Sequence, residues 1–223
     1  CAGCGKPVGE ESLHICWECL AGLWPVQFPH CSVCGNPVQG AVTNEYVCAL
    51  CCGRERHFDR ARSAVRYDGK IVGIIRAFKY VQAAHLSRDL ARLLAVCSSI
   101  HYASADIDAL MFVPLHHRKE RERTYNQAEL LASDLAALMR KPLLSRCLVR
   151  VRPTLTQTAL TAAERRKNVS GAFLVKNEGW VEGRRVLLVD DVMTTGATVD
   201  ECAKMLRRSG AAGVRVVTVA RGC

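Results

Sequence analysis

The sequence predicts an α/β protein in which a doubly wound parallel sheet follows a small cysteine-rich zinc module. Three observations lead to this prediction. Nine of the 13 cysteines lie within residues 1–52. Between residues 64 and 220, short apolar runs alternate with segments of helical periodicity, as in sheets built from strand–helix–strand units. The run Val186–Val189 contains no polar residue, as expected of a parallel strand that is covered on both faces.

Residues 1–56 are expected to form a double zinc ribbon. They contain four Cys-x-x-Cys pairs, and a gap of two residues lets a tight turn direct both thiolates at one ion. Gly5 and Gly35 follow the second cysteine of a pair, where such a turn needs a positive φ. The segment is too small to fold by hydrophobic burial alone, so we expect metal binding to supply the missing free energy. The predicted ligands are Cys1, Cys4, Cys16 and Cys19 for one Zn²⁺, and Cys31, Cys34, Cys48 and Cys51 for a second.

Other interpretations of these cysteines remain open from the sequence. The four pairs could bind one ion rather than two, or could form disulfides or redox-active pairs. Cys52 lies next to Cys51 and could replace it as a ligand. A closed site of four cysteines has no free coordination position, so we expect a structural role without chemistry.

Residues 57–223 are predicted to form the α/β domain, and periodicity indicates its first elements. Ala64–Tyr67 indicates a short strand, and Ile71–Tyr80 a helix with one apolar face. Apolar residues at helical spacing from Leu86 to Cys97 indicate a core-facing helix, and Ala109–Val113 a buried strand. The segment Pro114–Asn126 is strongly basic and is expected to be a loop at the carboxyl edge of the sheet.

The rest of the chain continues the alternation of helices and strands. An apolar stripe from Leu131 to Met139 indicates a helix. The segment Arg150–Val169 is long, polar and rich in threonine, so we expect a mobile lid containing a short helix, Ala162–Lys167, that Thr161 caps. Further strands are expected at Leu143–Val149, Ala172–Val175, Val186–Val189 and Val214–Val219.

The segment Val186–Thr198, VLLVDDVMTTGAT, carries the strongest functional signal. Asp190 and Asp191 follow the predicted strand, and the turn Thr194–Gly196 opens a helical pattern. Ligands of open α/β sheets bind at the carboxyl ends of the strands, and a helix N-terminus with a glycine and hydroxyl donors suits a phosphate. The two carboxylates are explained if they accept hydrogen bonds from sugar hydroxyls, such as those of a ribose 5-phosphate. The alternative is an ordinary strand–turn–helix with solvated aspartates.

The formal net charge of +10 favours polyanionic partners. Basic residues cluster at 118–123, 146–152 and 165–167, and a solvated face is the alternative for each cluster. For His116 and His117 we expect one packed and one solvated side chain, with acid–base catalysis as the alternative. No apolar run approaches the roughly 18 residues that a membrane span needs, so no membrane insertion is expected.

The central motif resembles the phosphoribosyl pyrophosphate (PRPP) loop of type I phosphoribosyltransferases. The whole chain resembles the competence protein F (ComF) family, because a cysteine-rich ribbon precedes FDRARSAVRYDG, IIRAFKY, VPLHHRKERERTYNQAE, ERRKNVSGAF and the PRPP loop in that order. The lid fits the pattern R-x-T-x-x-Q-x-x-L through Arg152, Thr154, Gln157 and Leu160. The resemblance implies a zinc ribbon joined to a type I phosphoribosyltransferase fold.

The resemblance also implies roles for individual residues. Arg152 and Gln157 would close over the site as catalytic residues. Thr124 and Tyr125 depart from the family pattern, in which glycine precedes the aromatic residue, so this turn is expected to be stiffer here. Asp190 and Asp191 would hold the ribose hydroxyls, Thr194, Thr195, Gly196, Ala197 and Thr198 the 5′-phosphate, and Leu115, His116, Arg118, Arg121 and Arg123 the pyrophosphate, which Mg²⁺ would bridge.

Two functions follow as expectations. Members of the family are linked to natural transformation, where they handle incoming single-stranded DNA on the cytoplasmic side, or to the use of DNA as a nutrient. The chain is therefore expected to be a cytoplasmic, PRPP-binding protein of DNA uptake. The alternative is an active phosphoribosyltransferase that transfers ribose 5-phosphate from PRPP to a nitrogen acceptor. The expected macromolecular partners are single-stranded DNA, with Tyr80, Tyr125 and Trp180 available for stacking, and a competence helicase that docks on the ribbon.

Overall fold

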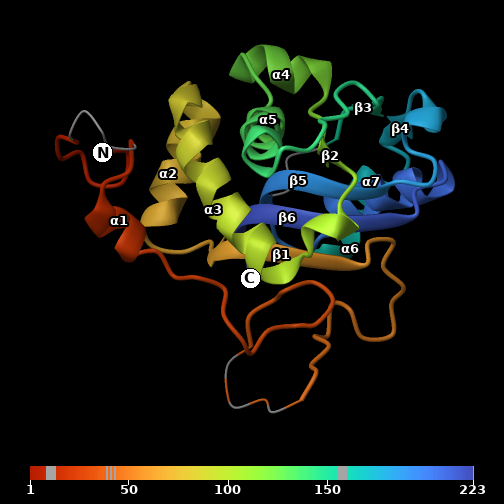
Figure 1. Cartoon of the computed structure of the whole chain (residues 1–223), viewed down its shortest axis with the longest axis horizontal. Helices are drawn as coiled ribbons and strands as arrows, with labels where there is room; N and C mark the ends of the chain where they lie inside the picture. The colour runs from red at the N-terminus through yellow and green to blue at the C-terminus, as the bar shows by residue number, and fades with distance from the viewer. Residues whose placement is uncertain (9–13, 39, 41, 43, 155–159, 223) are drawn as a thin grey trace.

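The computed structural model describes residues 1–8, 14–38, 40, 42, 44–154 and 160–222, and its centre is a four-stranded parallel sheet (Figure 1). The strands lie in the order β1 (Arg60–Arg66), β6 (Gly213–Arg221), β5 (Arg185–Met193) and β2 (Ala109–Phe112). The predicted parallel sheet is therefore confirmed. The helices are α1 (Trp17–Ala21), α2 (Lys70–Tyr80), α3 (Ser87–His101), α4 (His117–Arg123), α5 (Gln127–Met139), α6 (Ala162–Val169) and α7 (Ala197–Arg208).

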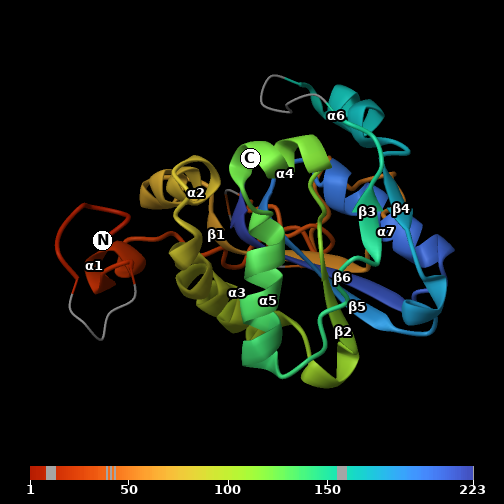
Figure 2. The ribbon, with the colours of Figure 1, turned by 90° about the horizontal axis from the view of Figure 1, so that it is seen from above.

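Successive residues of the central strand β5 face opposite layers. Leu187 and Val189 belong to one core, together with buried residues of α2, α3 and α5. Val186 and Leu188 belong to a second core, together with α7 and four cysteines of the second ribbon. The sheet is thus covered on both faces, as the uninterrupted apolar run predicted. Figure 2 shows α3 and α5 crossing one of these faces.

Two short strands, β3 (Leu148–Arg150) and β4 (Phe173–Val175), pair antiparallel with each other outside the main sheet. The prediction that these strands join the parallel sheet is therefore wrong. The strand expected from Leu143 begins only at Leu148, because the chain turns at Arg146, where φ is +65°. Before that turn, Leu143 makes a single parallel bridge with Leu110 of β2.

The basic segment after Pro114 is mostly helical, so the prediction of a loop is wrong for α4. Nδ1 of His116 caps this helix by accepting a hydrogen bond from the backbone N–H of Arg118 at 3.4 Å. Arg118 and Glu122 form an ion pair one turn apart, at 3.6 Å. Arginine, lysine and glutamate are good helix formers, but a helix made almost entirely of them has no apolar stripe by which it could be recognised.

The segment between the two ribbons covers one edge of the sheet. The backbone N–H of Val26 donates to the carbonyl of Ala64 at 3.1 Å, and that of Arg66 to the carbonyl of Trp24 at 2.7 Å. Strand β1 is therefore paired on both sides over this stretch, which removes an exposed strand edge. The first ribbon lies beside α2, and the loops of the second ribbon lie below the sheet (Figure 1).

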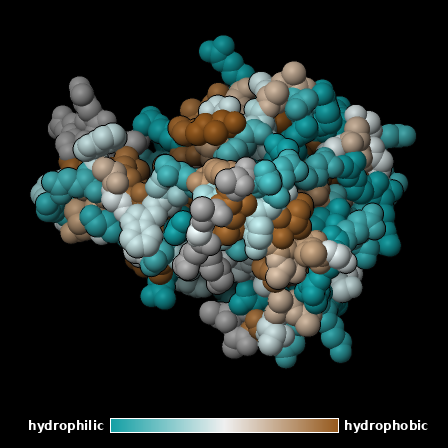
Figure 3. Space-filling view, turned by 90° about the horizontal axis from the view of Figure 1, so that it is seen from below, coloured by the Kyte–Doolittle hydropathy of each residue, from teal (hydrophilic) through white to brown (hydrophobic). Residues whose placement is uncertain are grey.

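On the surface seen from below, small groups of hydrophobic residues are interspersed with hydrophilic residues (Figure 3). Within the part of the chain that the structure describes, no helix combines the length and the apolar character that crossing a membrane requires.

Candidate functional site

The turn between β5 and α7, Thr194–Gly196, lies at the carboxyl end of the central strand. Gly196 is the N-cap of α7 and has a φ of +77°. This left-handed conformation favours glycine, and a Cβ atom here would lie 2.7 Å from Cε of Met193, which would have to shift. Nη1 of Arg165 donates to Oγ1 of Thr194 at 2.7 Å, which ties α6 to the turn. A helix N-terminus of this kind can bind a phosphate through its free N–H groups and its dipole.

Asp190 and Asp191 lie within β5, which continues past the predicted end at Val189 as far as Met193. Oδ1 of Asp191 lies 2.9 Å from Nζ of Lys79, in an ion pair that is largely shielded from solvent. Oδ1 of Asp190 accepts a hydrogen bond from the backbone N–H of Asp191, also at 2.9 Å. The strand thus brings two carboxylates to the same edge as the turn.

The surroundings of this carboxylate pair shift the pKa values of two groups. Burial and the charge of Asp191 raise the pKa of Asp190 to about 7. Burial alone would lower the pKa of Lys79, but the charge and hydrogen bond of Asp191 outweigh it, and the pKa is raised. Near neutral pH, Lys79 is therefore protonated, and Asp190 gains or loses a proton readily.

A cavity of about 210 Å³ lies against the two aspartates. Side chains from α2, α4, α5 and the end of β3 complete its wall. Asn126 at this wall both caps α5 and donates to the carbonyl of Val113. The polar residues that line the cavity are Lys79, Lys119, Arg123, Asn126, Gln127, Arg150, Thr154, Asp190, Asp191 and Thr198.

Several cations line this cavity together with the two aspartates. Burial and the nearby charges of Arg150 and Arg123 lower the pKa of Lys119. Nε of Arg150 is buried and has no hydrogen-bond partner among the described residues, and burial lowers the pKa of this guanidinium too. Like charges held this close repel one another. An anionic ligand would relieve this repulsion.

The residues predicted for the pyrophosphate are only partly brought together. Leu115 and Arg123 line the cavity, and His116 and Arg118 line a neighbouring cavity of about 270 Å³. Arg121 is exposed on α4 and lines neither cavity. The structure therefore places two of the five residues at the aspartates, and the roles of all five stay predictions.

Thr124, which departs from the family pattern, ends α4 with a φ of +69°. This left-handed conformation is unfavourable for a β-branched residue and easy for glycine. Glycine would therefore suit this position, and threonine holds the turn here in a strained conformation.

Neither of the two lid residues predicted to be catalytic, Arg152 and Gln157, is found at the cavity among the described residues. Gln157 falls outside the described residues. Arg152 donates to the carbonyls of Asn168 and Ser170 at 3.0 and 2.6 Å, at the end of α6, and does not line the cavity. The capping box at the start of α6, with Thr161 and Glu164, is confirmed. A catalytic role for Arg152 and Gln157 remains a prediction.

Lys79, Lys119, Asn126 and Arg150 line the cavity but were not predicted as site residues. Lys79 does not belong to the apolar face of α2, so the sequence gives it no pattern. It reaches Asp191 only through the tertiary fold. The sequence signal that could have revealed Arg150 is its place at the carboxyl end of a predicted strand, where ligands of α/β sheets bind.

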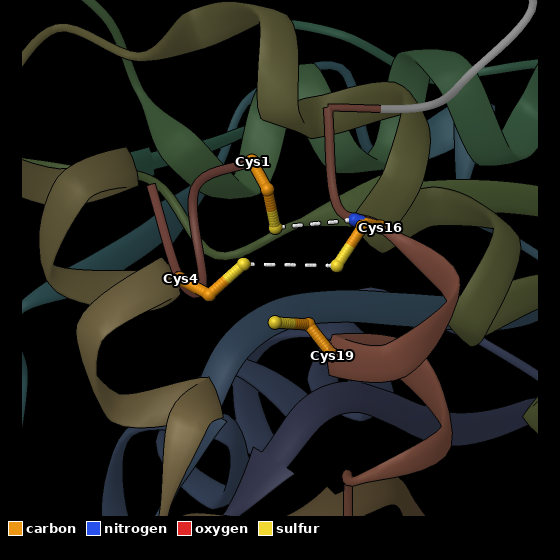
Figure 4. A group of neighbouring side chains, drawn as sticks. All are labelled: Cys1, Cys4, Cys16 and Cys19. Atoms are coloured by element: carbon orange, nitrogen blue, oxygen red, sulfur yellow. Dashed lines mark hydrogen bonds between the residues drawn. The ribbon is translucent and has the colours of Figure 1, made fainter. Parts of the chain in front are cut away.

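Eight cysteines form two groups in the predicted pairing, and in each group the sulfur atoms lie within 4.8 Å of one another. In the first group, the backbone N–H of Gly3 donates to Sγ of Cys1 at 3.3 Å. The backbone N–H of Cys16 donates to the same sulfur atom at 3.2 Å (Figure 4). In the second group, those of Cys34 and Cys48 donate to Sγ of Cys31.

Four sulfur donors at this spacing fit a tetrahedral Zn²⁺ site, so each group could hold one ion. Figure 4 shows all four sulfur atoms of the first group pointing into one space. Gly5 and Gly35 have φ values of +73° and +66°, as predicted for such turns. Cys52 is exposed and lies outside the second group, so Cys51 is the ligand candidate that the geometry selects.

Fold and site together define a phosphoribosyltransferase-type domain preceded by two four-cysteine groups. Residues 126–222 match the phosphoribosyl transferase domain family. Among solved structures, the chain is similar to glutamine phosphoribosylpyrophosphate amidotransferase of B. subtilis at 23% identity, with a TM-score of 0.43 over 64% of this chain and 30% of that one.

Curated relatives resemble the chain over most of its length. Competence protein F of Haemophilus influenzae is 34% identical over 87% of this chain and 85% of its own. DNA utilization protein YhgH of Escherichia coli K12 is 30% identical over 93% and 96%, and competence protein ComFC of Bacillus subtilis is 28% identical over 93% and 84%. The chain belongs to the competence protein F family.

Proposed function

We propose that this protein binds PRPP together with Mg²⁺ at the carboxyl edge of its sheet and acts in the uptake or utilisation of DNA. The observation that carries the first part is the meeting of the Asp190–Asp191 pair, the Thr194–Gly196 turn and a cation-lined cavity. The names of the relatives, competence proteins and DNA utilization proteins, support the second part.

Each part of the ligand has matching chemistry at the edge. Asp190 and Asp191 would accept hydrogen bonds from the ribose hydroxyls, and Thr194–Thr198 would hold the 5′-phosphate on the amides of the turn. Lys119, Arg123 and Arg150 would neutralise the pyrophosphate. Carboxylate oxygens are also the ligands that Mg²⁺ prefers, and bound Mg²⁺ would reduce the charge of the pyrophosphate further.

Phosphoribosyl transfer to a nitrogen acceptor is the second candidate function. The PRPP cavity adjoins two others, of about 250 and 270 Å³, and Lys119 lines all three. The adjoining space could admit an acceptor. Burial and the charges of His117 and of neighbouring arginines lower the pKa of His116. Nδ1 of the neutral imidazole accepts the hydrogen bond that caps α4, so the ring proton lies on Nε2 and could be donated in a hydrogen bond to an acceptor molecule in that space. Pyrophosphate release that depends on an acceptor would establish this function.

Single-stranded DNA is the proposed macromolecular ligand. Besides the net charge of +10, the exposed ring of Tyr80 carries the guanidinium of Arg123 at 5.0 Å and offers a base a stacking surface beside a cation. We place the protein in the cytoplasm, where a reducing environment would keep the eight clustered cysteines as thiolates for metal. The ribbons would then be available to dock a helicase.

Calorimetric titration of the zinc-loaded protein with PRPP and Mg²⁺ tests the proposal. We expect a dissociation constant in the micromolar range, about −8 kcal/mol, and at least a ~30-fold loss in Asp190→Asn/Asp191→Asn, equal to about 2 kcal/mol for the lost charged hydrogen bonds. Asp134→Asn on α5 removes one negative charge away from the cavity and should bind as the parent does.

Three results would contradict the proposal. They are no binding by the parent protein, binding by the double variant as tight as that of the parent, or a loss of affinity in Asp134→Asn as large as in the double variant. Single-stranded DNA titrated into the same proteins separates the two ligands. Retained DNA affinity in the double variant would show that DNA uses a surface other than the aspartate pair.

A further inference from the structure

The second cysteine cluster (Cys31, Cys34, Cys48 and Cys51) lies close to the turn Thr194–Gly196, which is called the phosphate turn below. Its four cysteines share a buried core with Met193, Ala197 and Val199, which flank the turn on both sides. In the first cluster, Cys19 packs instead in the core that contains α2 and α3. The two metal sites therefore differ in what they support.

Arg221, the last residue of β6, connects the second cluster to the turn. Its side chain is 1% exposed. Nη1 donates to the carbonyls of Met193 at 2.9 Å, Gly222 at 2.6 Å and Thr194. Nη2 lies 3.7 Å from Sγ of Cys34. One guanidinium thus contacts both a metal-ligand sulfur and the backbone that begins the turn.

The charge of Arg221 needs compensation. Among the described residues no carboxylate lies within ion-pair distance of its guanidinium, and an unpaired charge this deeply buried is costly. Four thiolates around one divalent cation leave an excess of negative charge beside Nη2. The metal-loaded cluster is therefore the counter-charge that the fold offers to Arg221.

Arg56 forms a second connection from the other half of the cluster. Its Nη2 donates to the carbonyl of Leu50, between Cys48 and Cys51, at 2.9 Å, and to the carbonyl of Thr195 at 3.3 Å. Its Nη1 lies 3.7 Å from Oδ2 of Asp200 in the first turn of α7. Both Cys-x-x-Cys turns of the cluster are thus tied to the phosphate turn by a buried guanidinium.

We propose that the metal ion of the second cluster holds the phosphate turn in its binding conformation through Arg221 and Arg56, which are positioning residues. Metal occupancy at this cluster and anion binding at the turn are then coupled, and the coupling is reciprocal. The order of the turn does not depend on what it binds; only the consequence for ligand affinity rests on the proposed PRPP site.

Hydrogen exchange of the zinc-loaded, ligand-free chain tests this coupling in the peptide 191–200. Arg221→Lys keeps the charge but cannot reach three carbonyls and the sulfur at once. Arg62→Lys is the matched control, because Arg62 is also buried. Its Nη2 donates to the carbonyl of Ser32, between Cys31 and Cys34, at 3.0 Å and makes no hydrogen bond to the phosphate turn. We expect exchange at least ~10-fold faster in Arg221→Lys, the factor for one lost charged hydrogen bond, and less than ~2-fold faster in the control.

Equal exchange in the two variants would overturn the proposal. A second measurement does not depend on Arg221→Lys folding: zinc is withdrawn with a chelator from Cys4→Ser, in which the first cluster has lost a ligand and the second is intact. Exchange in 191–200 should accelerate as the ion of the second cluster leaves, and unchanged protection would overturn the proposal. No ligand is present in either experiment, so failure here is distinct from failure of the PRPP titration.

Discussion

Replacing Asp190 by asparagine should stabilise this protein, and more so at alkaline than at acid pH. Asp190 is half-buried beside Asp191, and the loss of hydration together with the charge of Asp191 raises its pKa from 3.8 to about 7. At this carboxyl, the folded chain therefore binds more protons than the unfolded chain between about pH 4 and pH 7. The contribution of Asp190 to stability falls as pH rises through this window and then levels off. Asparagine keeps the oxygen that accepts the hydrogen bond from the N–H of Asp191 and carries no charge.

The magnitude follows from the two pKa values. A rise from 3.8 to about 7 costs the ionised carboxylate about 4 kcal/mol above pH 7, at about 1.4 kcal/mol for each tenfold change in proton affinity. At pH 5 the cost is only about 1.5 kcal/mol, because the folded protein keeps its proton. The stabilisation by Asp190→Asn should therefore be about 2 to 3 kcal/mol larger at pH 8 than at pH 5.

Urea unfolding at pH 5 and pH 8, with zinc present, measures this difference. Histidines and cysteines that titrate in the same range contribute equally to parent and variant, so they cancel. Asp134→Asn controls for the removal of one negative charge. A stabilisation of equal size at the two pH values would refute the reasoning, since it would mean that the Asp190 carboxyl is not protonated in the folded protein.

Five further substitutions, in three experiments, test the turns and the cysteine sites. Thr124→Gly should raise the free energy of unfolding by about 1 kcal/mol, because threonine is held at a φ of +69°; an unchanged urea midpoint would contradict this. Gly196→Ala should lose more stability than Gly171→Ala in the same assay, because both have a positive φ but only at Gly196 would the added Cβ atom clash. Cys52→Ser should retain two zinc ions per chain by metal analysis and Cys51→Ser only one; the reverse result would exchange the two ligands.

The parts of the fold and site that the sequence predicted are those with local signals. Val186–Val189 is apolar throughout, and the spacing of the Cys-x-x-Cys pairs predicts the two four-cysteine groups without reference to the rest of the chain. The turn at Gly196 is likewise local, since the same short segment supplies the glycine, the hydroxyls and the helix start.

The parts that were missed depend on tertiary contacts or lack a pattern. Lys79 reaches Asp191 only because the fold brings the end of α2 to the end of β5. Helix α4 consists almost wholly of charged residues, so no apolar periodicity marks it. In the sequence, Arg221 is simply a charged residue that follows a predicted strand. Only the structure shows that its guanidinium is buried next to Sγ of Cys34 and therefore needs a compensating charge.

A crystal structure of the zinc-loaded protein with PRPP and Mg²⁺ tests the central claim most directly. The account predicts the 5′-phosphate on the amides of Thr194–Thr198, the ribose hydroxyls at Asp190 and Asp191, and the pyrophosphate against Lys119, Arg123 and Arg150. A ligand bound through the cations alone, with its ribose away from the two aspartates, would contradict the account.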